Sequence, residues 1–188
     1  MKSIVSAAIL FAVITVGAFA LDGEVMEARG SVVYRTTNGQ MERLGRGDEI
    51  PQEGTIITAF NSEAVVEFPG WTMTVAALSR VDILEQRATE TERSTNVALP
   101  FGRVETYVEP DDEVSVDFRV ISPVSTASVR GTEFVYDGVV LRVLEGDVAI
   151  ENNIGQTHSV RAGQTSRAFD TEPITSVEAT LRERALLD

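Results

Sequence analysis

The chain has 188 residues and a formal net charge of −13, with one histidine and no cysteine. A chain of this length can form one domain with a substantial core. The lack of cysteine excludes thiol catalysis and thiolate metal sites. The strong negative charge is unfavourable for binding nucleic acid phosphates, so we expect no nucleic acid partner.

Residues 1–20 have the composition of a secretory leader. Lys2 gives a positively charged start, residues 4–20 are almost wholly apolar, and Ala18 and Ala20 frame a small-x-small cleavage site. We predict a signal peptide over residues 1–20 that is cleaved after Ala20, and a periplasmic or secreted protein without stable membrane insertion. The alternative is an uncleaved anchor, because the apolar run lies at the short end for spanning a bilayer.

Residues 21–172 have the pattern of a β domain. Trp71, Met73 and Val75 alternate with polar residues, which is the period of a half-buried strand. Asn38-Gly39 and Asp137-Gly138 are hairpin turn signals. We predict an all-β, jelly-roll-like sandwich or roll of roughly 12 to 14 short antiparallel strands.

Two segments depart from this alternation. Residues 86–96 are charged, rich in threonine and without apolar periodicity, so we predict an exposed connection there. After Pro173, where we expect the β region to end, Thr175 and Glu178 form a potential capping box, followed by an apolar stripe at helical spacing. We predict that residues 173–188 form a short helix that packs on the domain.

The two ends of the predicted β domain share a pattern of turn residues. Six positions recur at a constant offset of 116 residues, four of them within Gly or Gly-Gln turns. The first set is Gly30, Val32, Gly39-Gln40, Leu44 and Gly47, and the second is Gly146, Val148, Gly155-Gln156, Val160 and Gly163. This pseudo-repeat predicts that the first and last hairpins have a common architecture in equivalent positions.

One stretch interrupts the alternation between residues 120 and 150. It is Val129-Arg130-Gly131-Thr132-x-Phe134, followed downstream by Glu145-Gly146. This motif resembles the signature of the FecR-like domain, and the resemblance extends over about residues 23–169. In the best-known members the resemblance implies a periplasmic sensor domain behind one transmembrane helix, with a cytoplasmic segment that acts on a sigma factor. With three residues before the apolar segment, we expect a stand-alone exported form without the cytoplasmic sigma-regulating segment.

The sequence leaves little room for catalysis. Without the leader there is no lysine, which excludes Schiff-base chemistry, and a catalytic triad would have to use His158, which is better explained as an exposed loop residue. A cluster of acids forms a weak candidate for a calcium site, although solvated turn residues explain it better. These acids are Asp111, Asp112, Glu113 and Asp117. Trp71 is either a core residue or an exposed platform for a sugar or a partner.

For Arg130 two interpretations stand. It is either a surface residue beside a bulge made by Gly131, or a buried guanidinium paired with Glu133 or Glu145, which we favour. We predict a non-enzymatic envelope interaction or sensing module without a cofactor, whose partner is another envelope protein, with possible contact to a glycan or the cell wall. The alternative is a carbohydrate- or calcium-binding envelope domain.

Overall fold

A computed structural model describes residues 22–169 and 174–175. Alternating apolar residues form eighteen β-strands in this part of the chain. In chain order the strands are β1 (Gly23–Arg29), β2 (Val32–Arg35), β3 (Met41–Arg43), β4 (Glu49–Ile50), β5 (Gly54–Thr58), β6 (Glu63–Phe68), β7 (Trp71–Val75), β8 (Arg80–Ala88), β9 (Glu92–Phe101), β10 (Val104–Val108), β11 (Ser115–Ile121), β12 (Ser125–Val129), β13 (Thr132–Tyr136), β14 (Val140–Glu145), β15 (Asp147–Asn152), β16 (Thr157–Arg161), β17 (Gln164–Arg167) and β18 (Ile174–Thr175).

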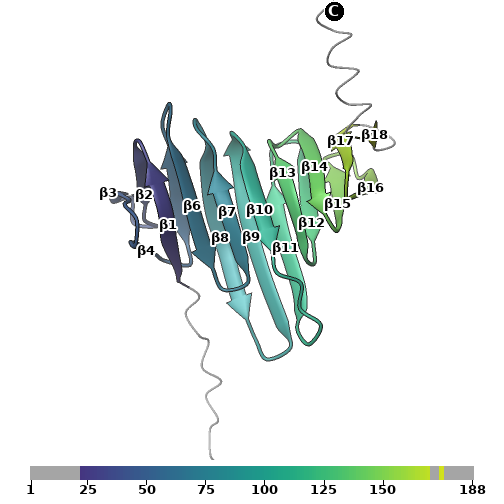
Figure 1. The fold of residues 1–188 in the computed structure, drawn as a ribbon, viewed down its shortest axis with the longest axis horizontal. Helices are drawn as coiled ribbons and strands as arrows, with labels where there is room; N and C mark the ends of the chain where they lie inside the picture. Colours follow the sequence, from purple (N-terminus) through teal and green to yellow (C-terminus); the bar gives the residue numbers. More distant parts are fainter. Residues whose placement is uncertain (1–21, 170–173, 176–188) are drawn as a thin grey trace, which may run out of the picture.

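The strands form two nine-stranded sheets that pack face to face as a sandwich (Figure 1). Sheet A has the order β18-β17-β14-β13-β10-β7-β6-β1-β4, and sheet B has the order β16-β15-β12-β11-β9-β8-β5-β2-β3. The predicted all-β sandwich is therefore confirmed, with more strands than the sequence pattern indicated. No helix is present among the residues that the structure describes, and thus none there is long and apolar enough to cross a membrane.

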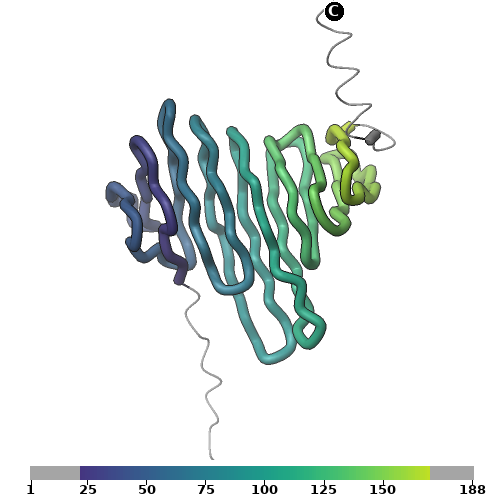
Figure 2. The backbone as a smooth tube through the Cα atoms, in the orientation of Figure 1, coloured from purple at the N-terminus to yellow at the C-terminus, as the bar shows by residue number. Residues whose placement is uncertain are grey.

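The connectivity differs from the predicted jelly roll. A jelly roll combines two Greek keys, in which a strand returns by a long connection to lie beside an earlier one. Here short segments cross repeatedly between the two sheets, and the chain advances from one end of the sandwich to the other (Figure 2). The sheets are also not wholly antiparallel, because β9 and β11 pair in parallel while β10 lies between them in sequence and belongs to sheet A.

The core lies between the two sheets. Trp71, Met73 and Val75 on β7 are all buried, while Thr72 and Thr74 point to the outer face, as the alternation predicts. The largest fully buried side chains include Tyr136, Phe118 and Phe134. Burying one such apolar side chain stabilises a fold by about 1.5–3 kcal/mol, so this layer is the main source of stability.

The predicted exposed connection at residues 86–96 is wrong. This segment forms the ends of β8 and β9, and only residues 89–91 make a turn. Its register pairs Gln86 with Thr95 and Arg87 with Ser94, and β11 pairs with the other side of β9. The segment lacks apolar periodicity because these strand ends extend past the core, where backbone hydrogen bonds rather than burial hold them.

The pseudo-repeat corresponds to a shared arrangement at the two ends of the sandwich. In the first copy β1 pairs with β4 in sheet A and β2 with β3 in sheet B, and in the second β14 pairs with β17 and β15 with β16. The amide of Gly39 donates to the Thr36 carbonyl over 2.9 Å, and the amide of Gly155 donates to the Asn152 carbonyl over 3.0 Å. All the glycines of the repeat have positive φ angles between 74° and 87°. The prediction of a common architecture is confirmed.

Two predictions fall wholly or largely outside the described residues. The signal peptide over residues 1–20 lies outside them, and so does most of the predicted helix over residues 173–188. Ile174 and Thr175 form β18, which pairs with β17. The β region therefore continues beyond Pro173, where the sequence pattern placed its end.

Candidate interaction surface around the Val129–Phe134 motif

The motif forms a crossing between the sheets. Val129 ends β12 in sheet B and Thr132 begins β13 in sheet A, so Arg130 and Gly131 are the link between them. Val129, Thr132 and Phe134 are buried, and only Arg130 of the motif side chains is exposed. The predicted bulge at Gly131 is wrong in position, since the nearby register shift lies between β13 and β14. There Glu133 pairs with Glu145 and Phe134 with Val143.

Close packing fixes this crossing. Gly131 has a φ of +144°, and a Cβ placed on it would lie 2.7 Å from the Cα of Pro110. Gly146, which the motif resemblance also included, approaches from the other side. A Cβ on Gly146 would lie 2.5 Å from Cγ2 of Thr132 and 2.8 Å from the Gly131 carbonyl oxygen. Glycine is therefore required at both positions, because a side chain would clash with its neighbours and because the backbone has a positive φ angle.

The favoured interpretation of Arg130 is wrong. Its side chain is exposed, and within the described residues it makes no ion pair with Glu133, Glu145 or any other carboxylate. The reason is the crossing itself. Val129 is the last residue of β12, so Arg130 lies in the link beyond the strand, where it lines the groove on the outer face of sheet B. Glu133 and Glu145 belong to sheet A.

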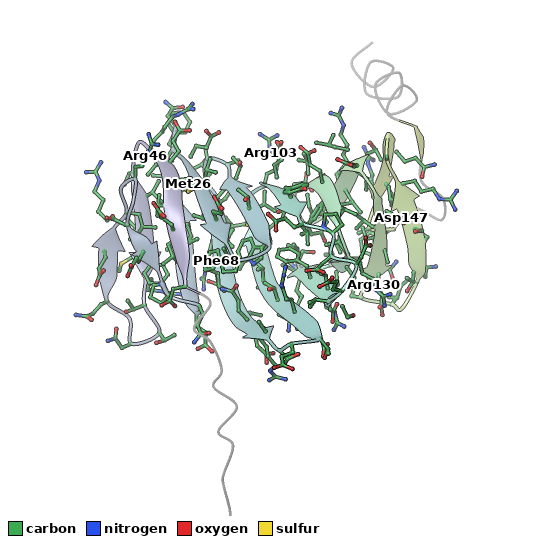
Figure 3. All side chains as sticks on the ribbon, turned by 60° about the horizontal axis from the view of Figure 1, so that its bottom comes forward. Met26, Arg46, Phe68, Arg103, Arg130 and Asp147 are labelled. Carbon is green, nitrogen blue, oxygen red and sulfur yellow. The ribbon has the colours of Figure 1, made fainter. Side chains whose placement is uncertain are left out.

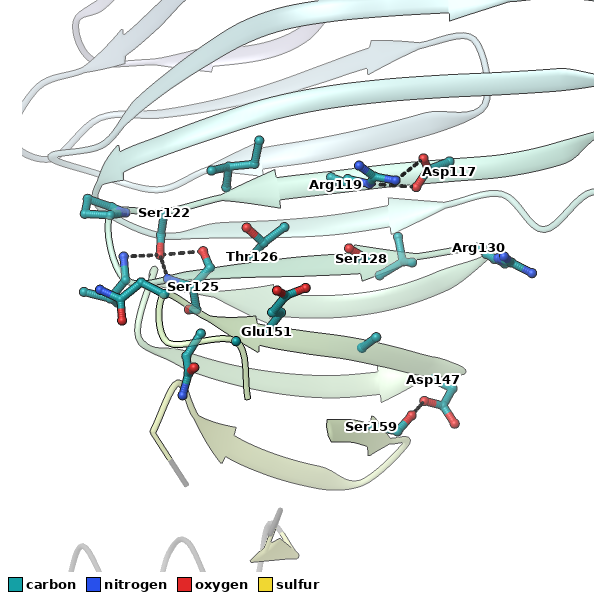
Figure 4. Close-up of a pocket in the computed structure, with 18 residues that line it drawn as sticks. Asp117, Arg119, Ser122, Ser125, Thr126, Ser128, Arg130, Asp147, Glu151 and Ser159 are labelled. Carbon is teal, nitrogen blue, oxygen red and sulfur yellow. Dashed lines mark hydrogen bonds and ion pairs between the residues drawn. The ribbon is translucent and has the colours of Figure 1, made fainter. Parts of the chain in front are cut away.

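The outer face of sheet B is hollowed into an open groove of about 1110 Å³ over β11, β12, β15 and β16 (Figure 4). Arg119, Ser128, Ala149 and Ser159 lie in register across these four strands. Three of the four side chains are small, so this row forms the floor of the groove. Arg130 lines the same groove at the end of β12.

Charged groups surround the floor, and some are already paired. Arg119 donates to both carboxylate oxygens of Asp117, over 3.1 and 2.7 Å. Asp147 accepts a hydrogen bond from the Ser159 hydroxyl and faces Arg161 at 3.6 Å. In the described part of the chain, Arg130 and Glu151 make no ion pair. The groove thus presents a cation and an anion that remain available to a bound molecule.

A buried hydroxyl network closes one end of the groove. The Tyr136 hydroxyl lies 2.6 Å from Ser125 Oγ and donates to Ser122 Oγ over 3.0 Å. Burial raises the pKa of this tyrosine, and the two serine hydrogen bonds oppose the rise. Sequence reasoning missed the network, although Ser122-Pro123 and the Asp137-Gly138 turn already marked the two loops that it joins.

The calcium candidates do not assemble into a site. Asp111 Oδ1 accepts hydrogen bonds from the amides of Glu113 and Val114, and Oδ2 pairs with Arg93 at 2.9 Å. The two amide hydrogen bonds lower the pKa of the Asp111 carboxyl. Asp117 is bound by Arg119 in the groove. The described residues contain no group of three or more acids or histidines that could hold a metal ion.

The other candidate residues have structural roles. Trp71 is 3% exposed and stacks on Phe68 with ring centroids 4.4 Å apart, so the exposed-platform interpretation is wrong. Its Nε1 donates to Gln86 over 3.3 Å. His158 is half-buried on β16 rather than in a loop, and its Nε2 lies 2.6 Å from Ser166 Oγ on β17. This contact joins β16, the edge strand of sheet B, to β17 of sheet A.

The arrangement defines a two-sheet β-sandwich with a polar groove on the outer face of one sheet. A family model described as FecR protein matches residues 54–149, just over half of the chain. The chain therefore belongs to the FecR family, as the motif predicted. The matched region begins at the first residue of β5 and ends within β15, so it includes Arg130 and most of the groove floor.

Comparison with solved structures agrees on the fold. Two crystal structures of a proposed anti-sigma factor from Parabacteroides distasonis, at 1.65 and 2.50 Å resolution, resemble this chain. Their TM-scores are 0.52 and 0.53, each with 15% sequence identity over 68% of this chain. The chain spans 64% and 63% of the length of those two proteins. No curated protein matches the sequence.

Proposed function

We propose that this chain is a non-enzymatic interaction or sensing module of the cell envelope, which binds another envelope protein through the groove on sheet B. Membership of the FecR family supports a role of this kind. The two similar solved structures are of a proposed anti-sigma factor, which supports a part in sigma-factor regulation. The leader pattern supports a periplasmic or secreted location with the leader removed after Ala20.

The observation that carries the proposal is the position of Arg130. The buried members of the motif explain the fold, because Val129, Gly131, Thr132 and Phe134 are packed in the crossing. Arg130 contributes no ion pair to the described part of the structure, yet it belongs to the same motif and stands at the groove. A planar guanidinium that remains available is well suited to bind a carboxylate of a partner with two hydrogen bonds.

The groove suits a protein segment better than a small substrate. It is wide, open and polar, whereas small-molecule sites are usually enclosed and mostly apolar. Its free charges, Arg130 and Glu151, would meet opposite charges of the partner and set the orientation of binding. The second candidate function is glycan binding. It is disfavoured because Trp71, the proposed aromatic platform for a sugar, is buried. Binding of the chain to a glycan array would support glycan binding after all.

The test is capture of an envelope protein by the purified chain. We expect Arg130→Glu to lose the captured protein, because the reversed charge repels a carboxylate. The matched control is Arg142→Glu, which makes the same charge change on an exposed residue of β14, on the outer face of sheet A. Equal capture by the two variants would contradict the role of the groove, provided that both unfold at the same urea concentration as the parent chain.

A further inference from the structure

Exposed apolar side chains gather at one edge of the sandwich. Phe60 and Leu78 are 72% and 57% exposed, on the loops that connect β5 to β6 and β7 to β8. Phe101, the last residue of β9, is 55% exposed at the start of the connection to β10. We call residues 59–62, 76–79 and 101–103 the apolar edge. In Figure 1 these loops lie side by side along the upper rim, at the ends of the central strands.

Hydrogen bonds join the loops of the apolar edge into one rigid unit. The Leu78 amide donates to the Ala59 carbonyl over 3.2 Å, and the Arg103 amide donates to Ser79 Oγ over 3.0 Å. A Cβ on Gly102 would lie 2.2 Å from Ser79 Oγ, so two loops touch there. The backbone that carries the apolar side chains is therefore held in place.

The backbone of Leu78, within the apolar edge, is in a strained conformation. Leu78 has a φ of +54°, and only Asn61 shares a positive φ among the non-glycine residues that the structure describes. Asparagine adopts this conformation at little cost, whereas for leucine it costs about 1–2 kcal/mol. An exposed leucine at a position that favours glycine contributes nothing evident to folding. Such outliers are typical of functional sites.

The loops at the two edges of the sandwich differ in charge. The loops of the apolar edge contain no carboxylate and one arginine, Arg103. Near these loops the Arg43 guanidinium donates to the carbonyl of Gly30, which packs against Ser62, and Glu63 pairs with Arg29 at 3.7 Å. Neither Arg43 nor Arg103 makes an ion pair within the described residues. In Figure 3, which is turned by 60° from Figure 1, Arg103 lies in the upper part of the view and Arg130 in the lower part. At the opposite edge the turns at residues 89–91 and 109–114, which we call the acidic edge, carry five acids. Arg130, next to the Gly131 that packs on Pro110, is a basic residue beside them.

We propose that the apolar edge docks on an anionic phospholipid surface. Convex apolar tips with basic neighbours have the chemistry of an interfacial anchor, in which apolar side chains enter the headgroup region and arginines bind lipid phosphates. The arginines beside the apolar edge meet the lipid phosphates, whereas the acidic edge faces away from the bilayer in this orientation. The net negative charge of the chain therefore does not prevent docking.

The position of the N-terminal strand adds a condition. β1 begins at Gly23, at the edge opposite to the apolar edge, as its pairing with β4 and β6 shows. A leader retained as an anchor would hold the acidic edge at its own membrane and turn the apolar edge away. The docking proposal therefore concerns the chain after removal of residues 1–20.

The experiment is sedimentation of residues 21–188 with vesicles of phosphatidylcholine alone or mixed with phosphatidylglycerol. Folding of each variant is first verified by circular dichroism. We expect binding to the mixed vesicles that weakens as salt is added, because exposed charges are screened. We expect Phe60→Ser, Leu78→Gly and Arg103→Glu each to weaken binding by about tenfold or more. Leu78→Gly is informative because it removes the backbone strain, so lost binding cannot be ascribed to unfolding.

The controls are Met41→Ser and Arg142→Glu. Met41 is a 63% exposed apolar residue of β3, away from the apolar edge, and Arg142 lies on the face of sheet A. Both variants should bind like the parent chain. The proposal is overturned if the chain binds neither type of vesicle, if it binds both equally, or if the edge and control variants behave alike. Lipid-independent capture of an envelope protein that the edge variants lose would assign the edge to a protein partner instead.

Discussion

Gly131 and Pro110 touch so closely that no side chain fits between them. A Cβ on Gly131 would lie 2.7 Å from both Cα and Cβ of Pro110. The pair joins the loop before β11 to the crossing between β12 and β13. The most recognisable motif of the sequence is therefore first a packing device, and its one exposed member, Arg130, is the part that remains for binding.

Gly131→Ala should destabilise the domain by about 2–4 kcal/mol, through backbone strain together with overpacking against Pro110. The matched control is Gly155→Ala. Gly155 also has a positive φ, of 80°, but open space where a Cβ would be, so we expect a loss of about 1 kcal/mol. Urea unfolding measures both. Equal losses would contradict the importance of the Pro110 contact.

Arg130→Ala should change the free energy of unfolding by no more than about 0.5 kcal/mol, because the side chain is exposed and makes no ion pair within the described residues. Breaking a buried ion pair would instead cost about 3–5 kcal/mol. A shift of that size in urea unfolding would show that Arg130 has a buried partner in solution.

Trp71→Ala should destabilise the domain by about 3–5 kcal/mol, since it removes a buried ring that stacks on Phe68 and contacts Phe118. Trp71 is also the only tryptophan of the chain. Its fluorescence in the native parent chain should therefore be poorly quenched by acrylamide and become readily quenched on unfolding. Ready quenching in the native state would show that Trp71 is exposed and would contradict its place in the core.

Tyr136→Phe should cost about 0.5–1.5 kcal/mol at neutral pH, because it removes the hydroxyl that bonds to Ser122 and Ser125 while both serines keep other hydrogen-bond partners. Burial raises the pKa of the tyrosine above its usual 10.0. The folded state thus holds this proton more tightly than the unfolded state does. Its contribution is complete below the ordinary pKa and is lost as pH rises through the raised one.

The alkaline loss of stability should accordingly be smaller in Tyr136→Phe than in the parent chain. Urea unfolding at a series of alkaline pH values checks this. Tyr34, whose pKa burial also raises, should retain its own share of the loss in both proteins. Identical pH profiles for the parent and the variant would mean that Tyr136 already ionises normally in the folded state.

Local patterns predicted much of this fold, and long-range pairing was beyond them. The Asn38-Gly39 turn and the pseudo-repeat depend on backbone angles that glycine alone adopts readily, so the positions of the glycines predict them. The parallel pairing of β9 with β11 could not be predicted in this way. Alternation shows which face of a strand is buried, but it does not show which strand lies next to it. For the same reason the sequence suggested a jelly roll, where the chain instead advances steadily along the sandwich.

The site was less predictable than the fold. The motif identified Arg130 as a candidate. Where its side chain lies, however, depends on the crossing from β12 in sheet B to β13 in sheet A, which the sequence does not reveal. Ser128, Ala149 and Ser159 form the groove floor only through the register of three strand pairs. As separate small residues on separate strands, they give no signal along the chain.

The most direct test of the groove as the binding surface is photo-crosslinking in living cells. A photoreactive amino acid replaces Ser128 on the groove floor or, as a control, Thr74. Both positions are half-buried and lie on the outer faces of opposite sheets. We predict a discrete adduct with one envelope protein from Ser128 and none from Thr74, and loss of that adduct in Arg130→Glu. Adducts from Thr74 alone, or the same adduct from both positions, would contradict the account.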